Sequence, residues 1–314
     1  MGNRQALLHI FPGDIREVLG RLNLNYEKLQ EIRLRSERPI AVLWDGKEYF
    51  VKKSGEATVY SEDGYCPGSQ EMVQIMEYVS GYSMYAFEEE LRQGFLTIQG
   101  GHRVGIAGKV LLENGKVKNI RHIAFIHIRL CHQIPGCADA LMPYLTEKEN
   151  VYHTLIISPP GAGKTTLLRD VIRQISNGIE GCAGKNVAVV DERSELAGSY
   201  YGVPQNDLGI RTDILDGCPK AEGMMMMIRS MAPEVIAVDE IGTEEDRSAI
   251  ETASCCGCKV LATVHGSSVE DIQRNPCIQR LCEEKTFERY VVLNREYGKG
   301  HIQAIYDGTF RRLL

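Results

Sequence analysis

The sequence predicts an α/β domain with a buried parallel sheet in residues 141–314, preceded by a smaller α+β domain in residues 1–140. The 314 residues are enough for two domains. In the second part, four apolar runs rich in β-branched residues alternate with longer helical or loop segments, as is typical of parallel strands covered on both faces. In the first part, short helical segments alternate with strands and hairpin turns. The four apolar runs cover residues 154–157, 186–190, 235–238 and 259–264.

Short elements separated by turns are expected in the first domain. Asp45-Gly46 is typical of a two-residue hairpin turn, and Gly100-Gly101 and Asn114-Gly115 are expected to break later strands. Pro135-Gly136 closes this half of the chain. We expect helices over residues 14–22 and 70–93, the second interrupted at Gly81, and strands over residues 31–35 and 41–51.

The composition is that of an ordinary globular protein, with 43% hydrophobic and 25% charged residues, which argues against disorder. A formal net charge of −6 gives no overall basic field to attract nucleic acid, so nucleic acid is not an expected partner. No segment approaches the roughly 18 uninterrupted apolar residues that span a bilayer, and the start of the chain lacks the apolar core of a signal peptide. We therefore expect a cytoplasmic protein.

Two groups of sulfur-containing residues stand out. Ten cysteines are scattered beside apolar residues, which is typical of reduced thiols in a reducing compartment. Cys255, Cys256 and Cys258 resemble half of a zinc site, but no second pair lies at the required spacing, so we expect small buried packing residues. The methionine run over residues 224–227 is expected to fill a helix core or a soft interface.

The strongest motif is a phosphate-binding loop after the first apolar run. Residues 158–165 match the pattern G-x-x-x-x-G-K-[ST] except at the first position, where Ser158 replaces glycine. A helix is expected to start at this loop, so backbone N–H groups and the helix N-terminus would surround phosphate oxygens. Lys164 is expected to reach the β and γ phosphates, and Thr165 to ligate Mg²⁺. The predicted nucleotide-binding residues are Pro160, Gly161, Ala162, Gly163, Lys164, Thr165 and Thr166.

Polar residues follow each of the four apolar runs. Because the carboxyl ends of parallel strands meet at one edge of a sheet, these residues are expected to converge on one site. Asp239 is predicted to hold the magnesium ion, and Glu240 to activate the attacking water as a general base. Thr263 and His265 are predicted to sense whether the terminal phosphate is present.

The second run ends in a further acidic group. Asp191, Glu192 and Glu195 are equally compatible with an acid-rich helix N-terminus, which the helix dipole favours, and with a catalytic role. Glu192 is our candidate for a catalytic acid, and Asp191 and Glu195 are its alternatives.

Nucleotide hydrolysis of this type gains roughly 10³ to 10⁵ in rate from an arginine that neutralises charge in the transition state. Arg229 lies on the helix expected before the Asp239 strand, and Arg103 and Arg129 lie on strands of the first domain. These three are the candidates, although each is also compatible with an ordinary solvated charge. Period-two alternation places Arg129 on one face together with Arg121, Ile123, Phe125 and His127.

Four segments of the chain resemble the conserved boxes of the type II/type IV secretion ATPase superfamily, the hexameric RecA-like motors of secretion systems and pili. Residues 31–39 and 101–105 also resemble parts of the family's N-terminal domain, so the resemblance covers most of the chain. Two features depart from the pattern: many pilus motors carry glycine at the position of Asp239, and the acidic box lacks the family's Asp-Pro step. The four boxes occur in the family's order, at residues 160–166, 191–195, 233–241 and 261–266.

The resemblance implies a RecA-like P-loop NTPase domain with a smaller α+β N-terminal domain, in a homo-oligomer, expected to be a hexamer, that hydrolyses ATP with Mg²⁺. The specific match is to a sporulation member of the superfamily. It implies action in the mother-cell cytoplasm of an endospore former, from the cytoplasmic side, on membrane-embedded subunits of a sporulation channel. The family's N-terminal arginines complete a neighbouring subunit's site, which makes Arg103 and Arg129 candidates in trans.

Two other functions use the same loop. A small-molecule kinase would need an arginine-rich lid, and none is evident between the acidic box and Asp239. A nucleic-acid-dependent motor would need a basic channel, against which the acidic balance of the chain argues mildly.

Overall fold

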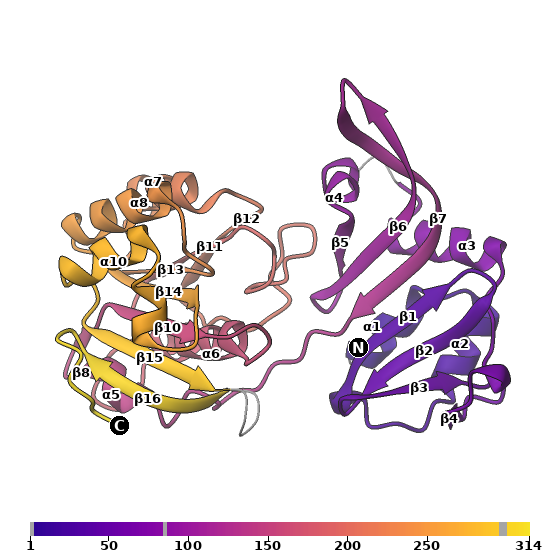
Figure 1. The fold of residues 1–314 in the computed structure, drawn as a ribbon, viewed down its shortest axis with the longest axis horizontal. Coiled ribbons are helices and arrows are strands. Elements are labelled where there is room, and N and C mark those ends of the chain that lie inside the picture. Colours follow the sequence, from indigo (N-terminus) through magenta and orange to yellow (C-terminus); the bar gives the residue numbers. More distant parts are fainter. Residues whose placement is uncertain (1–2, 84–86, 295–299) are drawn as a thin grey trace. The chain divides into compact units, whose positions relative to one another are not determined.

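The computed structural model describes residues 3–83, 87–294 and 300–314. The chain divides into two compact units, Met1–His132 and Gln133–Leu314 (Figure 1). The sequence-based boundary lies at residue 140 instead. Residues 133–140 belong with the second unit because Ala138 is fully buried in its core and donates its N–H to the Asp170 carboxylate at 2.8 Å.

The first unit is built on one antiparallel sheet in the order β4-β3-β2-β1-β7-β6-β5. The expected turn at Asp45-Gly46 joins β2 to β3, and both residues have positive φ, as a tight two-residue hairpin turn requires. The strands are β1 (Leu29–Arg35), β2 (Arg38–Trp44), β3 (Lys47–Val51), β4 (Ala57–Thr58), β5 (Phe95–Ile98), β6 (His102–Glu113) and β7 (Lys116–Arg129). The helices are α1 (Asn3–His9), α2 (Gly13–Gly20), α3 (Ser69–Val79) and α4 (Glu88–Gln93).

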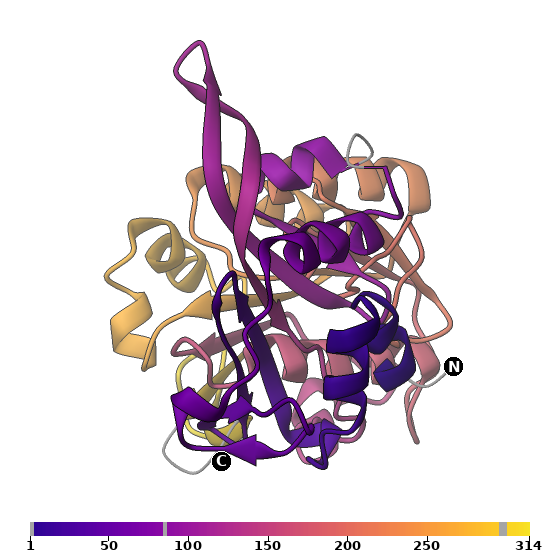
Figure 2. The same ribbon diagram turned by 90° about the vertical axis from the view of Figure 1, so that its right-hand side faces the viewer.

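Strands β6 and β7 are the longest of this sheet, and their far ends project from it as a two-stranded ribbon (Figures 1 and 2). The ribbon turns at Asn114-Gly115, as expected from the sequence. A bulge lies at Gly108, where a Cβ atom would meet the carbonyl oxygen of Arg121 at 2.6 Å, so only glycine fits this position. Beyond the bulge, Leu112 is exposed although it is apolar.

The second unit contains a sheet in the order β12-β11-β13-β14-β10-β15-β16, parallel except for β16. The four apolar runs form the central strands β10, β11, β13 and β14, and these are buried almost throughout. The strands are β10 (Thr154–Ser158), β11 (Val187–Asp191), β12 (Thr212–Asp216), β13 (Val235–Val238), β14 (Lys259–His265), β15 (Arg289–Asn294) and β16 (His301–Asp307), with a separate hairpin of β8 (Thr146–Glu147) and β9 (Asn150–Val151).

Helices cover both faces of this sheet, which is why its strands read as continuous apolar runs. On one face, α5 and α6 pack with side chains such as Ile156 and Val189. On the other, α7 to α10 pack with alternate residues such as Ile157 and Val190. The helices are α5 (Met142–Leu145), α6 (Lys164–Asn177), α7 (Lys220–Met231), α8 (Glu244–Cys255), α9 (Val269–Ile272) and α10 (Pro276–Glu283).

The sulfur-containing residues only partly follow the prediction. Cys258 is buried, but Cys255 and Cys256 are exposed at the end of α8, so the packing interpretation is wrong for these two. Met224 and Met227 fill the core on α7, as expected, because they lie three residues apart on the buried side of the helix.

Candidate functional site

The predicted phosphate-binding loop connects β10 to α6. Gly161 and Gly163 have φ values of 73° and 100°, a left-handed conformation that glycine adopts without steric cost. Ser158 is the last residue of β10 and does not have a positive φ, so the first position of the pattern does not need glycine here. The backbone N–H groups at the start of α6 have no carbonyl partners within the helix and are available for phosphate oxygens.

The structure brings the predicted chemical groups together at the carboxyl edge of the second sheet. Lys164 Nζ lies 2.6 Å from Glu240 Oε1, and Thr165 Oγ1 donates to Asp239 Oδ2 at 2.8 Å. His265 Nε2 lies 2.9 Å from Glu240 Oε1. These contacts form because β13, β14 and β10 are neighbours in the sheet and all run parallel.

Thr263 connects the two acids at the tip of β13. Its hydroxyl donates to Asp239 Oδ1 and accepts the backbone N–H of Glu240 at 2.9 Å, and the whole side chain is buried. Glu240 itself has a φ of 56°, which is uncommon for a residue with a Cβ and is typical of functional sites.

The Glu240 carboxylate is held in its ionised form. Burial raises its pKa, but hydrogen bonding and charge from Lys164, with further positive charge from His265 and Arg193, outweigh burial and lower it below the ordinary value. Glu240 is therefore charged at neutral pH and is a proton acceptor, as a general base must be.

A threonine hydroxyl and a carboxylate are the kinds of hard oxygen ligand that Mg²⁺ prefers. Thr165 Oγ1 and Asp239 Oδ2 are already 2.8 Å apart, at the end of the loop where a nucleotide phosphate would supply further oxygens. These two residues therefore fit a magnesium ion bound together with phosphate.

The acidic box differs in structure from the expectation of a helix N-terminus, because residues 192–199 contain turns, bends and irregular backbone but no helix. Asp191 is 2% exposed, and its carboxylate accepts the backbone N–H groups of Glu195, Leu196 and Ala197. Burial raises the pKa of Asp191, against these three hydrogen bonds. Asp191 thus fixes the loop, whereas Glu192 is exposed and paired with Lys220.

Sequence reasoning missed Arg193, which lies between these acids. Its guanidinium donates from one terminal nitrogen to Glu240 Oε2 at 2.7 Å, so it is the described arginine that contacts the predicted general base. The sequence offered one indication of it, because Arg193 is the basic residue within the acidic segment 191–195. A small cavity lies beside it, lined by Asp191, Glu192, Arg193, Glu195, Lys220, Asp239 and Glu240.

Of the three arginines chosen from the sequence, Arg229 lies away from Glu240 within the second unit, and Arg103 and Arg129 belong to the first unit. Arg229 is exposed near the end of α7, which leads into the amino end of β13, so it lies at the opposite edge of the sheet from Glu240. Arg103 on β6 and Arg129 on β7 lie opposite each other in the strand register of the first unit. The Arg103 guanidinium lies 3.6 Å from the centre of the Phe95 ring, and Arg129 is exposed.

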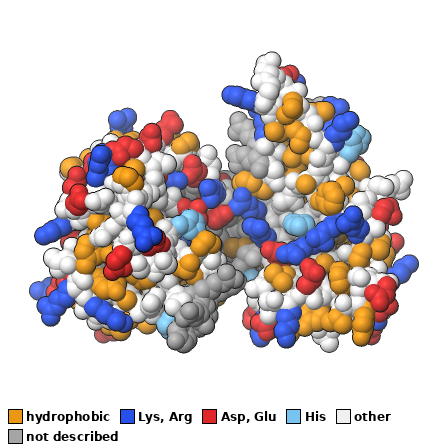
Figure 3. Space-filling model, viewed as in Figure 1, with side chains coloured by type: hydrophobic (Ala, Val, Ile, Leu, Met, Phe, Trp, Pro, Cys, Tyr) orange, Lys and Arg blue, Asp and Glu red, His pale blue; other side chains and the backbone are white. Residues whose placement is uncertain are grey.

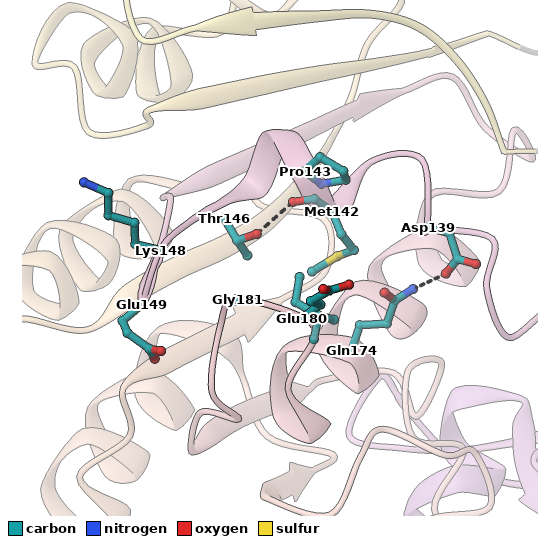
Figure 4. A pocket seen from close by; sticks show the side chains of 10 residues that line it. Asp139, Met142, Pro143, Thr146, Lys148, Glu149, Gln174, Glu180 and Gly181 are labelled. Carbon is teal, nitrogen blue, oxygen red and sulfur yellow. Dashed lines mark hydrogen bonds between the residues drawn. The ribbon is translucent and has the colours of Figure 1, made fainter.

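A much larger cavity of about 930 Å³ lies away from the loop, near the C-terminal end of α6 (Figure 4). Its wall combines apolar side chains with three acids and one lysine, and Gln174 on α6 donates to Asp139 at 2.8 Å. Gln174 is ten residues after Lys164, about 15 Å along the helix, so size does not identify the chemical site in this unit. The lining residues are Asp139, Met142, Pro143, Thr146, Lys148, Glu149, Gln174, Ile179, Glu180 and Gly181.

Comparison with known proteins identifies the family. Residues 1–313 match the family described as sporulation stage III, protein AA. The chain belongs to this family. Stage III sporulation protein AA of Bacillus subtilis (strain 168) is 43% identical to it over 302 residues, which are 96% of this chain and 94% of that protein.

Solved structures agree with the predicted fold of this stage III protein AA family member. The ATPase DotB of Yersinia pseudotuberculosis has a TM-score of 0.57 and 16% identity, covering 90% of this chain and 76% of that one. The pilus retraction motor PilT with bound ADP also has a TM-score of 0.57, with 17% identity and coverage of 91% and 77%. These likenesses confirm the predicted α/β fold.

Among the described residues, no helix is both long and apolar enough to cross a membrane.

Proposed function

We propose that this chain is a Mg²⁺-dependent ATPase that powers a secretion-like channel complex during sporulation. The observation that carries the proposal is the hydrogen-bonded group of Lys164, Thr165, Asp239, Glu240 and His265 at the carboxyl edge of a parallel sheet. These residue types, at the end of a phosphate-binding loop, are the ones that nucleotide hydrolysis requires.

The residues have distinct roles in this reaction. Lys164 and the loop N–H groups bind the β and γ phosphates, so Lys164 exchanges its contact with Glu240 for phosphate oxygens. The water oxygen bonds to the γ phosphorus, the bond to the ADP oxygen breaks, and Glu240 accepts the proton of the water. His265 orients the Glu240 carboxylate from 2.9 Å.

Thr165 and Asp239 are the residues that would hold Mg²⁺, which neutralises phosphate charge when it is bound. The hydroxyl of Thr165 must then turn from Asp239 so that its oxygen lone pair faces the cation.

The biological setting of the proposal comes from the family. The Bacillus subtilis relative is named for stage III of sporulation, and the pilus motor and the ATPase DotB share the fold. These findings support our proposal that the protein is a homo-oligomeric ring, proposed to be a hexamer, that acts in the mother-cell cytoplasm on membrane-embedded subunits of a sporulation channel. Arg103 and Arg129 are proposed to complete the site of a neighbouring subunit.

ATP turnover by the purified full chain tests the enzymatic part. Lys164→Ala and Glu240→Gln are each expected to reduce phosphate release by at least about 100-fold, because each removes a group that acts in the transition state. Lys53→Ala, at an exposed position of the first unit, is the matched control and should retain turnover. Phosphate transfer to a small acceptor would instead indicate a kinase, and stimulation by single-stranded nucleic acid would indicate a nucleic-acid motor.

Mixed oligomers test the arginines. Arg103→Ala and Glu240→Gln subunits are each expected to be inactive alone, and mixing them should restore part of the turnover because some shared sites then receive both residues. The same mixture is made with Arg129→Ala. If neither mixture regains activity, the role of these arginines in trans is wrong, whereas the ATPase proposal stands on the Lys164 and Glu240 variants.

A further inference from the structure

Glu240 is surrounded by cations and donors from three different elements. Lys164 at the start of α6 and His265 at the end of β14 contact Oε1, at 2.6 Å and 2.9 Å. Arg193, from the loop after β11, contacts Oε2 at 2.7 Å. The single carboxylate of Glu240 is thus the shared partner of a lysine, an arginine and a histidine.

Such a cluster is suited to a larger anion than a carboxylate. A terminal phosphate carries more negative charge than Glu240 and has three oxygens, so it can accept hydrogen bonds from all of these donors. Glu240 therefore lies where these donors converge, which is the position that suits a terminal phosphate. Lys164 cannot serve both partners fully, since its ammonium is already 2.6 Å from Glu240.

The position of Arg193 lets its side chain change partner. Its backbone lies in a fixed loop, because Asp191 accepts three backbone N–H groups and Ser194 donates to Asp216 at 2.7 Å. The side chain of Arg193 is 60% exposed, so it is not locked by packing. A guanidinium also binds two phosphate oxygens at once, which an ammonium does not do.

We propose that Arg193 is a catalytic residue that binds the γ phosphate of ATP within its own subunit, and that Glu240 is its partner whenever no γ phosphate is bound. This inference rests on the proposed ATPase function. When ATP binds, Lys164 and Arg193 pass from Glu240 to the phosphate, and Glu240 is released to accept the proton of the attacking water. ADP lacks the γ phosphate, so Arg193 stays with Glu240 when ADP is bound.

The test compares Arg193→Ala and Arg193→Lys with the wild-type full chain. Arg193→Ala is expected to lower kcat by about 100- to 1,000-fold, in the range of a transition-state donor. It should also lower the preference for an ATP analogue over ADP at least about tenfold, measured with fluorescent nucleotides, since ADP never contacts Arg193. Arg193→Lys should recover part of both. Arg274→Ala removes an arginine that is 84% exposed and serves as the control.

These measurements distinguish recognition of the γ phosphate by Arg193 from a purely structural role of this residue, and from a failure of the proposed ATPase function. Weaker binding of ATP and ADP by the same factor, with earlier thermal unfolding, would show that Arg193 only holds the loop and would overturn the inference. A kcat within about threefold of wild type would overturn it as well. Should the wild-type chain fail to hydrolyse ATP, the proposed function is wrong, and the ratio of ATP to ADP affinity in Arg193→Ala still decides whether Arg193 recognises the γ phosphate.

Discussion

Replacing Thr263 with valine removes one fully buried hydroxyl two residues before the end of β14 and keeps the shape of the side chain. That hydroxyl makes two hydrogen bonds, one to the Asp239 carboxylate and one from the Glu240 backbone N–H. A hydrogen bond to a charged group contributes about 1.5–3 kcal/mol, and leaving a buried partner unsatisfied costs about 1–3 kcal/mol. Because the two effects overlap, we expect Thr263→Val to lower the free energy of unfolding of the second unit by about 3 kcal/mol.

Urea unfolding measures this change. With a dependence of about 2 kcal/mol per molar urea, a loss of 3 kcal/mol moves the midpoint down by about 1.5 M. Thr263→Ser is the matched control: it keeps the hydroxyl and loses one buried methyl group, which costs about 1 kcal/mol or about 0.5 M. If Thr263→Val and Thr263→Ser unfold at the same urea concentration, the hydroxyl does not stabilise the two acids and the reasoning is refuted.

Three further predictions concern the second unit. Asp170 is buried, which raises its pKa, but hydrogen bonds from a backbone amide, an arginine and a glutamine outweigh burial and lower it. The ionised Asp170 therefore stabilises the folded state at neutral pH, and this stabilisation is lost as the pH falls through the lowered pKa. Asp170→Asn should lower the free energy of unfolding by about 2 kcal/mol at pH 7, and in urea melts its stability should depend less on pH in the acid range. Burial and a nearby lysine lower the pKa of His153 to about 4. The unfolded chain then binds a proton that the folded chain does not, so stability should fall by about 1.4 kcal/mol per pH unit between roughly pH 6.5 and 4, and a His153→Gln variant with an unchanged slope would contradict this. On α7, a Cβ atom at Gly223 would lie 2.5 Å from a methyl carbon of Val190. Gly223→Ala should therefore lower the midpoint of thermal unfolding, although alanine is more favourable than glycine in a helix by about 1 kcal/mol. A raised midpoint would show that Val190 moves aside without cost and would contradict this prediction.

The central strands and their polar ends are visible in the sequence for a physical reason. A strand buried on both faces must be apolar at every position, and it ends where the chain meets water, so residues 154–157 and 235–238 mark both the strands and the site that follows them. The edge strand β12 was not predicted because its residues are half exposed and form no apolar run. In contrast, β15 was missed although Tyr290 to Leu293 are all buried, a signal that was available.

The contacts within the site are harder to predict. The pairing of Arg193 with Glu240 depends on an irregular loop and on a left-handed residue at the tip of β13, neither of which has a periodic signature. Arg229 was assigned to the site by proximity in sequence. Its side of the sheet follows from chain direction, because a helix that leads into a parallel strand ends at the amino edge of the sheet.

Helix α6 has the phosphate-binding loop at its first residue and the large cavity near its last turn. Its 14 residues form a rod of about 21 Å with a buried apolar side along the sheet. Within this helix Lys164 and Gln174 lie ten residues apart with hydrogen-bonded backbone between them, and no proline interrupts the helix. One continuous, buried helix therefore joins the phosphate-binding loop to the wall of the cavity that Gln174 lines.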